Sequence, residues 1–373
     1  MNLLKGITIL VGCVIGAGIL GVPYAVYQAG FLTGILVLLI LGIAVLLINL
    51  FLGEIALRTK ETHQLPGYAE IYLGSRAKKI MLLAMTIGIY GALTAYLIGE
   101  GEVLSALFGM STQAGTLIFF LVGGTLIYTG LKAIDKAEGW LVFLLVIITL
   151  IVFIFSLTKI QPGEFSDFSI AKVFIPYGVI LFALNGMVAI PEMKEELIEN
   201  RHLLKKAIII GTLIPVVIYA LFVIAVMGSS GGSFPEGSTM ANDVIRESIG
   251  GVAATAFDIF TFLAMASSFL VLGLALNWLF RYDVGLDKRL SWFAALLPPL
   301  FIALLDIASF AAILSFVGSF CVGIQAIMVV IMHRKAKEKS QRTPEYSIKT
   351  VPAVNYFLIL LLCTGVVIGT FFV

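Results

Sequence analysis

Residues 15–25 read IGAGILGVPYA and lie within the first long apolar stretch of the chain. Three glycines and a proline are poor helix formers, and an unsatisfied backbone group inside a membrane costs several kcal/mol. The segment therefore predicts a helix that is interrupted for a purpose, and the rest of the sequence indicates what that purpose is.

The composition is that of a polytopic membrane protein. Of its 373 residues, 60% are hydrophobic and 12% are charged, whereas a soluble domain averages about 45–50% and about 25%. The first stretch lacks a convincing cleavage site and another span follows at once, so we expect it to be retained. A net charge of +2 predicts no nucleic-acid partner. Cys13, Cys321 and Cys363 are too far apart to predict a metal cluster or a disulfide framework.

A window of about 20 apolar residues is long enough to cross a bilayer as a helix. Eleven such windows are predicted, at residues 4–28, 31–57, 78–108, 113–131, 138–158, 172–196, 203–228, 252–281, 289–305, 309–333 and 350–372. The sequence thus predicts an all-α, multi-pass protein of the cell membrane.

The basic residues orient these spans. If the N-terminus is cytoplasmic, all of the 24 lysines and arginines except Lys159, Lys172 and Arg246 fall on the cytoplasmic side. This bias predicts a cytoplasmic N-terminus and an external C-terminus. Residues 65–74 predict a short cytoplasmic interfacial helix, and residues 229–250, the longest external connection, predict either an outer lid or an inert ordered loop.

The sixth span repeats the pattern of the first. In LFALNGMVAIPEM (181–193), Gly186 precedes Pro191 by five positions, as Gly18 precedes Pro23. Two five-span halves, 1–158 and 172–333, would each begin with such a helix, followed by a peripheral eleventh span at 350–372. An odd number of spans per half inverts one half relative to the other, as in secondary transporters with paired discontinuous helices.

The broken helices suit a zwitterion. Glycines at positions 16 and 18 let the backbone unwind, and Pro23 is expected near the start of the second half-helix, where its missing N–H costs nothing. The freed N–H groups suit a carboxylate, and the freed carbonyls suit an ammonium group or a small cation. Close helix packing is the alternative role of these glycines. We expect a leucine at Gly18 to abolish binding without unfolding the protein.

Four stretches resemble the amino acid–polyamine–organocation superfamily, with its LeuT-type fold of two inverted five-helix repeats. The nearest families are the amino acid/auxin permeases and the hydroxy and aromatic amino acid permeases. The first helix resembles theirs in VIGAGILGVPYA (14–25), and the second span does so in LLINLFLGEIAL (46–57). YGALTAYLIGEGEVL (90–104) resembles the neutral amino acid branch, and LAMASSFLVLGLAL (263–276) resembles the aromatic branch.

The resemblance implies a transporter that imports a neutral or aromatic α-amino acid by alternating access. The N–H groups of Ala17 and Gly18, in a turn begun at Gly16, would bind the carboxylate. The amino group would lie on the carbonyls of Val14, Phe182 and Ala183. The remaining expected pocket residues, beside the second break and in span three, are Asn185, Gly186, Met187, Tyr90 and Tyr96.

Sodium is the favoured coupling ion. Ala264, Ser267 and Ser268 share one helical face, and in sodium-coupled members of the fold this spacing supplies half of an ion site. The carbonyls of Gly12 and Ile15 would complete it. Back-bonded or packing serines are the alternative.

Proton coupling is the rival mechanism. Span five has no lysine and the three histidines lie in cytoplasmic segments, so a proton would need an acid. Carboxylates inside the membrane are functional candidates, and here these are Asp258, Glu192 and Glu100, with Asp258 the first to test. Glu54 has Arg58 one turn on as a structural partner.

Other function classes remain open to different degrees. The sequence has none of the motifs that a membrane-embedded enzyme would need, so no enzyme activity and no cofactor besides sodium is predicted. A polyamine or organic-cation carrier would favour acids at the breaks, which have none. A sensor would usually need a soluble output segment, and only about three residues precede the first span. The sequence leaves the oligomeric state open.

Overall fold

The computed structural model describes residues 2–130, 165–231, 233–349 and 351–371, with four helical positions between the first two ranges. The predicted fifth span, 138–158, lies almost entirely outside these residues. In the described ranges every regular element is helical. The first half contains α1 (Asn2–Val14), α2 (Gly18–Ala29), α3 (Phe31–Arg58), α4 (Leu65–Leu73), α5 (Ser75–Phe108) and α6 (Thr112–Thr129).

The second half begins with short pieces and continues with long helices. Its short elements are η2 (Ile170–Lys172), α8 (Tyr177–Ala183), η3 (Met187–Ala189), α9 (Ile190–Glu196) and η4 (Arg201–Leu203). Then follow α10 (Leu204–Ser229), α11 (Ala241–Ser248), α12 (Gly251–Trp278), η5 (Leu279–Asp283) and α13 (Lys288–Leu304). The chain ends with α14 (Phe310–Phe316), η6 (Val317–Val322), α15 (Gly323–Glu338) and α16 (Pro352–Phe371).

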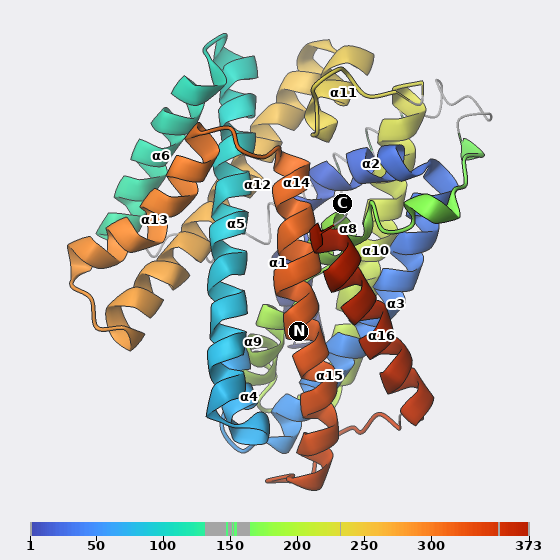
Figure 1. Ribbon diagram of the computed structural model, residues 1–373, viewed down its shortest axis with the longest axis vertical. Helices are drawn as coiled ribbons and strands as arrows, with labels where there is room; N and C mark the ends of the chain where they lie inside the picture. Colours follow the sequence, from blue (N-terminus) through green and yellow to red (C-terminus); the bar gives the residue numbers. More distant parts are fainter. Residues whose placement is uncertain are drawn as a thin grey trace.

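Seven helices among the described residues are long and apolar enough to cross a membrane, and α1 with α2 forms a further, bent pair. The axes of this pair differ by 56°, and the break falls at residues 15–17, as the glycines predict. The sixth span is divided into α8 and α9 by residues 184–189. Figure 1 shows α1 and α8 near the centre of the bundle, α6 and α13 on one flank and α16 on the other.

The two prolines have different local roles. Pro191 is within the first two residues of α9, where a missing N–H has no cost, as expected. Pro23 is the sixth residue of α2, so the same expectation for Pro23 is wrong. A proline at this depth removes the donor that the carbonyl of Ile19 would have received in a regular helix.

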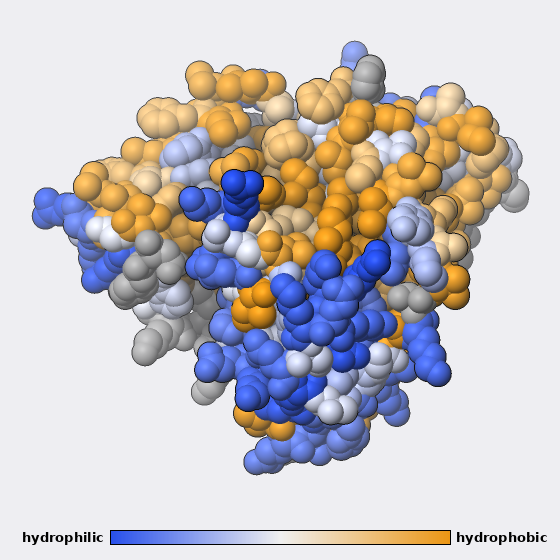
Figure 2. All heavy atoms as spheres, turned by 60° about the horizontal axis from the view of Figure 1, so that its bottom comes forward, coloured by the Kyte–Doolittle hydropathy of each residue, from blue (hydrophilic) through white to orange (hydrophobic). Residues whose placement is uncertain are grey.

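The surface separates into apolar sides and one hydrophilic end (Figure 2). This end contains α4, the start of α5 and the last turns of α15 (Figure 1), and we call it the basic end because Arg58, Lys78, Lys194 and Arg342 lie there. The short helix predicted at 65–74 is present as α4. The orientation of this end toward the cytoplasm remains a prediction from the distribution of basic residues.

The span that was predicted at 309–333 is not a uniform α-helix. It contains a π-helical segment, η6, between α14 and α15, and periodicity did not predict it. A Cβ atom on Gly318 of this segment would lie only 2.8 Å from the backbone nitrogen of Phe182. The π-helical segment therefore packs directly against the end of α8, where the second break begins.

Candidate substrate site at the two helix breaks

The first break exposes backbone donors. The N–H groups of Gly16, Ala17 and Gly18 donate to no backbone carbonyl within the described ranges, while Ile19 and Leu20 donate to Gly16 (3.3 Å) and Ala17 (3.1 Å). The carbonyls of the turn are thus bonded to α2, and the three N–H groups remain at its positive end. Such an end is a ready site for a carboxylate.

Three elements meet beside Gly16. A Cβ atom there would lie 3.6 Å from the hydroxyl oxygen of Ser268 in α12 and 4.0 Å from that of Tyr96 in α5. Tyr96 is buried. The fold therefore brings Gly16, Tyr96 and Ser268 together from segments far apart in the sequence, and a methyl group at Gly16 would already contact both hydroxyls.

The second break satisfies more of its own backbone. The N–H of Asn185 donates to Phe182 (3.1 Å) and that of Ala189 to Gly186 (3.1 Å). The side chain of Asn185 accepts from the N–H of Met187 at 3.3 Å. The Phe182 carbonyl, expected to bind the amino group, therefore already accepts one hydrogen bond.

The two breaks touch each other at Gly18. A Cβ atom on Gly18 would lie 2.5 Å from the Cα of Ala183, so α2 and α8 approach as closely as only a glycine permits. The expectation that leucine at this position would spare the fold is therefore wrong. Packing and binding both depend on the same glycine.

Tyr219 of α10 joins the two breaks. Its fully buried hydroxyl lies 2.7 Å from the carbonyl oxygen of Val14 and 3.0 Å from that of Ala183. These are two of the three carbonyls expected to bind the substrate amino group. One hydroxyl has a single proton, so Tyr219 can donate fully to only one of the two carbonyls at a time. The carbonyls can therefore accept further hydrogen bonds.

Asn49 of α3 is a second buried polar neighbour of the breaks. Its side-chain amide donates to Thr212 of α10 at 3.2 Å, and the same nitrogen would lie 3.6 Å from a Cβ atom on Gly186. Neither Tyr219 nor Asn49 was predicted as a site residue. Asn49 could have been recognised from the sequence, because it is a polar residue within a strongly apolar span. Tyrosines in spans usually pack or anchor at the interface, so Tyr219 could not be recognised in this way.

Two residues that the sequence predicted for the site, Tyr90 and Glu192, lie in surroundings other than the substrate pocket. The Tyr90 hydroxyl donates to the carbonyl of Ala294 in α13 at 2.7 Å, which corresponds to the packing role and not to a pocket contact. Glu192 is exposed in the first turn of α9, and its role as a proton-coupling residue stays a prediction.

Asp258 belongs to a network with α11, at the end of the bundle opposite the basic end (Figure 1). It accepts from Asn242 at 2.8 Å and from Arg246 at 3.0 Å, and Arg246 also binds Asp243 at 2.6 Å. Burial disfavours the charge of Arg246, but its bonds to the two aspartates outweigh this and raise its pKa. The segment 229–250 also packs Phe234 against Tyr24 of α2, with ring centroids 5.5 Å apart.

The residues of α12 that the sequence suggests for a sodium site have a defined local geometry. The hydroxyls of Ser267 and Ser268 both donate to the carbonyl of Ala264, at 2.9 and 3.1 Å. This is the back-bonded arrangement, and it leaves lone pairs on both hydroxyl oxygens. Of the two, Ser268 is the one that lies beside Gly16 at the first break.

Glu100 of α5 differs from the other acids. Its side chain is fully buried, and neither carboxylate oxygen has a hydrogen-bond partner within the part of the chain that the structure describes. An ionised carboxylate in such surroundings is very costly, so a buried acid without a partner favours the protonated form.

Comparison with known proteins identifies the family. The family model described as tryptophan/tyrosine permease matches residues 1–372. The chain belongs to this family. The permease is 28% identical to tyrosine-specific transport system 2 of Haemophilus influenzae, over 96% of this chain and 93% of that one. It is 23% identical to glutamine transporter 2 of Aliivibrio fischeri, over 89% of each.

Solved structures support the fold. MhsT in complex with L-phenylalanine has a TM-score of 0.74 at 16% identity, covering 99% of the permease and 98% of that chain. A manganese transporter of Eremococcus coleocola has a TM-score of 0.69 at 13% identity, covering 99% and 86%. The predicted LeuT-type fold is confirmed, and the permease is a multi-pass membrane transporter and not an enzyme. The expected superfamily holds at a coarse level and the matched family is the tryptophan/tyrosine permeases, while the two families named from the sequence stay predictions.

Proposed function

We propose that the permease imports an aromatic amino acid, with tyrosine as the first candidate, by alternating access driven by a cation gradient. The observation that carries the proposal is the pairing, at one place, of three N–H groups at residues 16–18 with the carbonyls of Val14 and Ala183. This arrangement complements a zwitterion, because it offers donors to the carboxylate and acceptors to the ammonium group.

The side-chain preference rests on different evidence. Two relatives from H. influenzae are named tyrosine-specific transport systems, and the family name specifies tryptophan and tyrosine. We assign the aromatic ring to the region next to Gly16 and Tyr96, with Phe182 at the second break as its proposed neighbour. Gly186 and Met187 complete the proposed lining, and Asn185 is proposed to hold their backbone in shape through its bond to the Met187 N–H.

A ligand series tests this assignment. Radiolabelled tyrosine uptake into proteoliposomes should be inhibited by tyrosine, tryptophan and phenylalanine, and far less by tyramine, which lacks the carboxylate, or by 4-hydroxyphenylpropionate, which lacks the amino group. Each analogue lacks one half of the zwitterion, so each should bind at least tenfold more weakly. Inhibition by tyramine as strong as that by tyrosine would instead support an organic-cation carrier.

Sodium remains the favoured ion, and the structure supplies a specific rival. The free lone pairs of Ser267 and Ser268, with the carbonyls of Ala264, Gly12 and Ile15, support a sodium site next to the first break. The burial of Glu100 without a partner among the described residues supports a proton carrier. Uptake driven separately by a sodium gradient and by a pH gradient distinguishes the two.

Matched variants locate the coupling residues. For sodium, Ser267→Ala with Ser268→Ala should reduce the sodium dependence, while Thr255→Ala should not, since Thr255 is back-bonded on the same helix to Gly251 at 3.3 Å. For protons, Glu100→Gln should abolish the response to a pH gradient. Glu102→Gln is its control, because Glu102 lies two residues further along α5 and is only partly buried. Uptake that ignores sodium in the wild type rejects the sodium site, and unchanged pH-driven uptake in Glu100→Gln rejects the proton site.

A further inference from the structure

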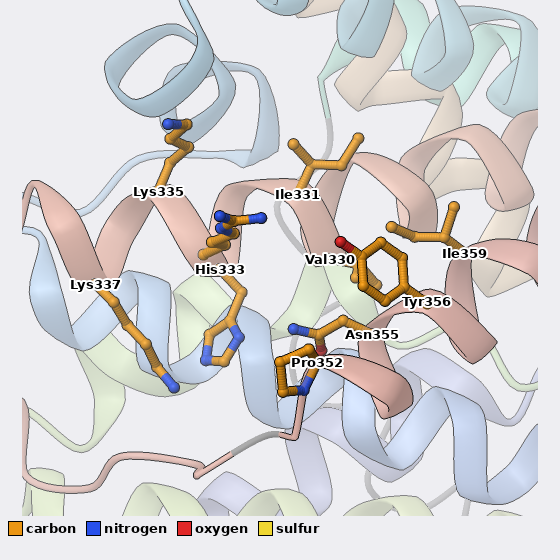
Figure 3. Close-up of a pocket in the computed structure, with 10 residues that line it drawn as sticks. Val330, Ile331, His333, Lys335, Lys337, Pro352, Asn355, Tyr356 and Ile359 are labelled. Carbon is orange, nitrogen blue, oxygen red and sulfur yellow. The ribbon is translucent and has the colours of Figure 1, made fainter.

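A groove lies between α15 and α16 at the basic end, away from the helix breaks (Figure 3). Its volume is about 670 Å³. The residues that line it come from the last turns of α15 and the first turns of α16: Val330, Ile331, His333, Arg334, Lys335, Lys337, Pro352, Asn355, Tyr356 and Ile359.

The groove has an apolar part and a basic part. The two helices run in opposite directions, so the last turn of α15 and the first turn of α16 lie at the same edge of the membrane. Ile331 comes three residues before Arg334 in α15, and Ile359 comes seven residues after Pro352 in α16, so both isoleucines lie deeper than these ends. Figure 3 shows both isoleucines on the side of the groove away from Lys337. Ile331 and Tyr356 remain exposed. The groove thus changes from basic to apolar along its length. This order complements a phospholipid, whose anionic headgroup is followed by apolar acyl chains.

The basic part has an excess of positive charge. The side chains of Arg334 and Lys335 are 75% and 45% exposed, and Glu338 pairs with both, at 3.8 and 2.9 Å. Lys337 donates to the carbonyl of Ile348. The single carboxylate of Glu338 therefore faces two exposed cations, Arg334 and Lys335. The positive end of the 20-residue helix α16 lies at the same edge.

We propose that this groove binds an anionic phospholipid, with its phosphate on Arg334 and Lys335 and one acyl chain along Ile331, Ile359 and Tyr356. Basic pockets between helices at the membrane surface suit anionic headgroups, and the exposed apolar part would be covered by the acyl chain. A bound lipid would also hold α16 in place. That helix packs tightly on the core through Gly365, where a Cβ atom would collide with the ring of Tyr177 in α8.

Native mass spectrometry of the purified permease with phosphatidylglycerol or phosphatidylcholine tests the site. We expect phosphatidylglycerol to bind more tightly, and Arg334→Gln with Lys335→Gln to weaken its binding about thirtyfold, since each basic residue near the surface contributes on the order of 1 kcal/mol. Lys205→Gln with Lys206→Gln is the matched control, because both lysines are exposed at the start of α10 and the charge change is the same.

Two results would overturn the proposal. One is equal affinity for the two lipids in the wild type. The other is an equal loss of phosphatidylglycerol in both double variants, which would show a general charge effect instead of a site. Correct folding of the variants is checked by their thermal unfolding in detergent, and a third variant, Tyr356→Ala, should weaken binding without changing the charge.

Discussion

The two helix breaks have similar sequences but different backbone chemistry. The first break leaves the N–H groups of Gly16, Ala17 and Gly18 without backbone acceptors among the described residues, whereas the second uses Asn185 to cap Met187 and bonds Ala189 back to Gly186. The difference teaches that a repeated glycine and proline pattern does not imply repeated roles. We infer that the first break supplies donors for the ligand, while the second mainly holds its own shape.

The largest effect is expected from a side chain at the contact between the breaks. Gly18→Val would place atoms against the backbone of Ala183, which cannot move aside as a flexible side chain could, so we expect a loss of about 1–3 kcal/mol or more and little folded protein. Gly16→Ala is the control, because its Cβ would meet Ser268 at an ordinary 3.6 Å. Thermal unfolding of both variants in detergent measures this, and a stable Gly18→Val protein would contradict the close contact.

An intermediate effect is expected where one hydroxyl joins the breaks. Tyr219→Phe leaves the carbonyls of Val14 and Ala183 without this donor in the ligand-free protein, which costs about 1–3 kcal/mol. If the substrate ammonium takes over these carbonyls, the ligand-free state is destabilised more than the bound state. Tyrosine should then bind up to about tenfold more tightly to the variant, as measured by equilibrium binding in detergent.

Weaker binding to Tyr219→Phe would mean that the hydroxyl itself holds the substrate. Tyr68→Phe is a suitable control, because Tyr68 is also fully buried but its hydroxyl accepts from the N–H of His63 in the segment before α4.

The smallest effect is expected at the second break. Asn185→Ala removes one 3.3 Å hydrogen bond to the Met187 N–H, which corresponds to about 0.5–1.5 kcal/mol of stability. If the second break is mainly a scaffold, the KM for tyrosine should change less than about threefold in proteoliposome uptake. A much larger change in KM would show that Asn185 contacts the substrate, and the contrast between the two breaks would then disappear.

Much of the architecture could be predicted because it depends on local properties. Apart from the fifth span, which lies outside the described residues, and the divided sixth, the apolar windows predicted the positions of the helices from α3 to α16 closely, since their length is set by the membrane. The glycines at 16 and 18 predicted the position of the first break. The resemblance to known transporters led to the right fold and to amino acid transport, but it did not specify a substrate, because the shared motifs are specific for amino acid transport in general.

The candidate site was only partly predictable. Ser268 and Tyr96 were expected for separate roles, yet they lie together beside Gly16. Tyr90 was expected in the pocket but bonds to α13, because a helix periodicity does not say which neighbour faces a given side. Asp258 was the first acid to test, but α11 supplies the arginine that holds it, and no spacing within α12 could indicate that.

The sequence by itself determined that this chain crosses the membrane many times and that its first and sixth helices are broken, and it predicted that the breaks suit a zwitterion. These properties follow from hydropathy, from glycine and proline, and from the backbone groups they free. Only the tertiary structure decided that Tyr219 joins the two breaks, that Gly18 packs on Ala183 and that Glu100 is buried without a partner among the described residues. The reason is physical: contacts between segments far apart in sequence depend on how the helices pack, and no local pattern encodes that packing.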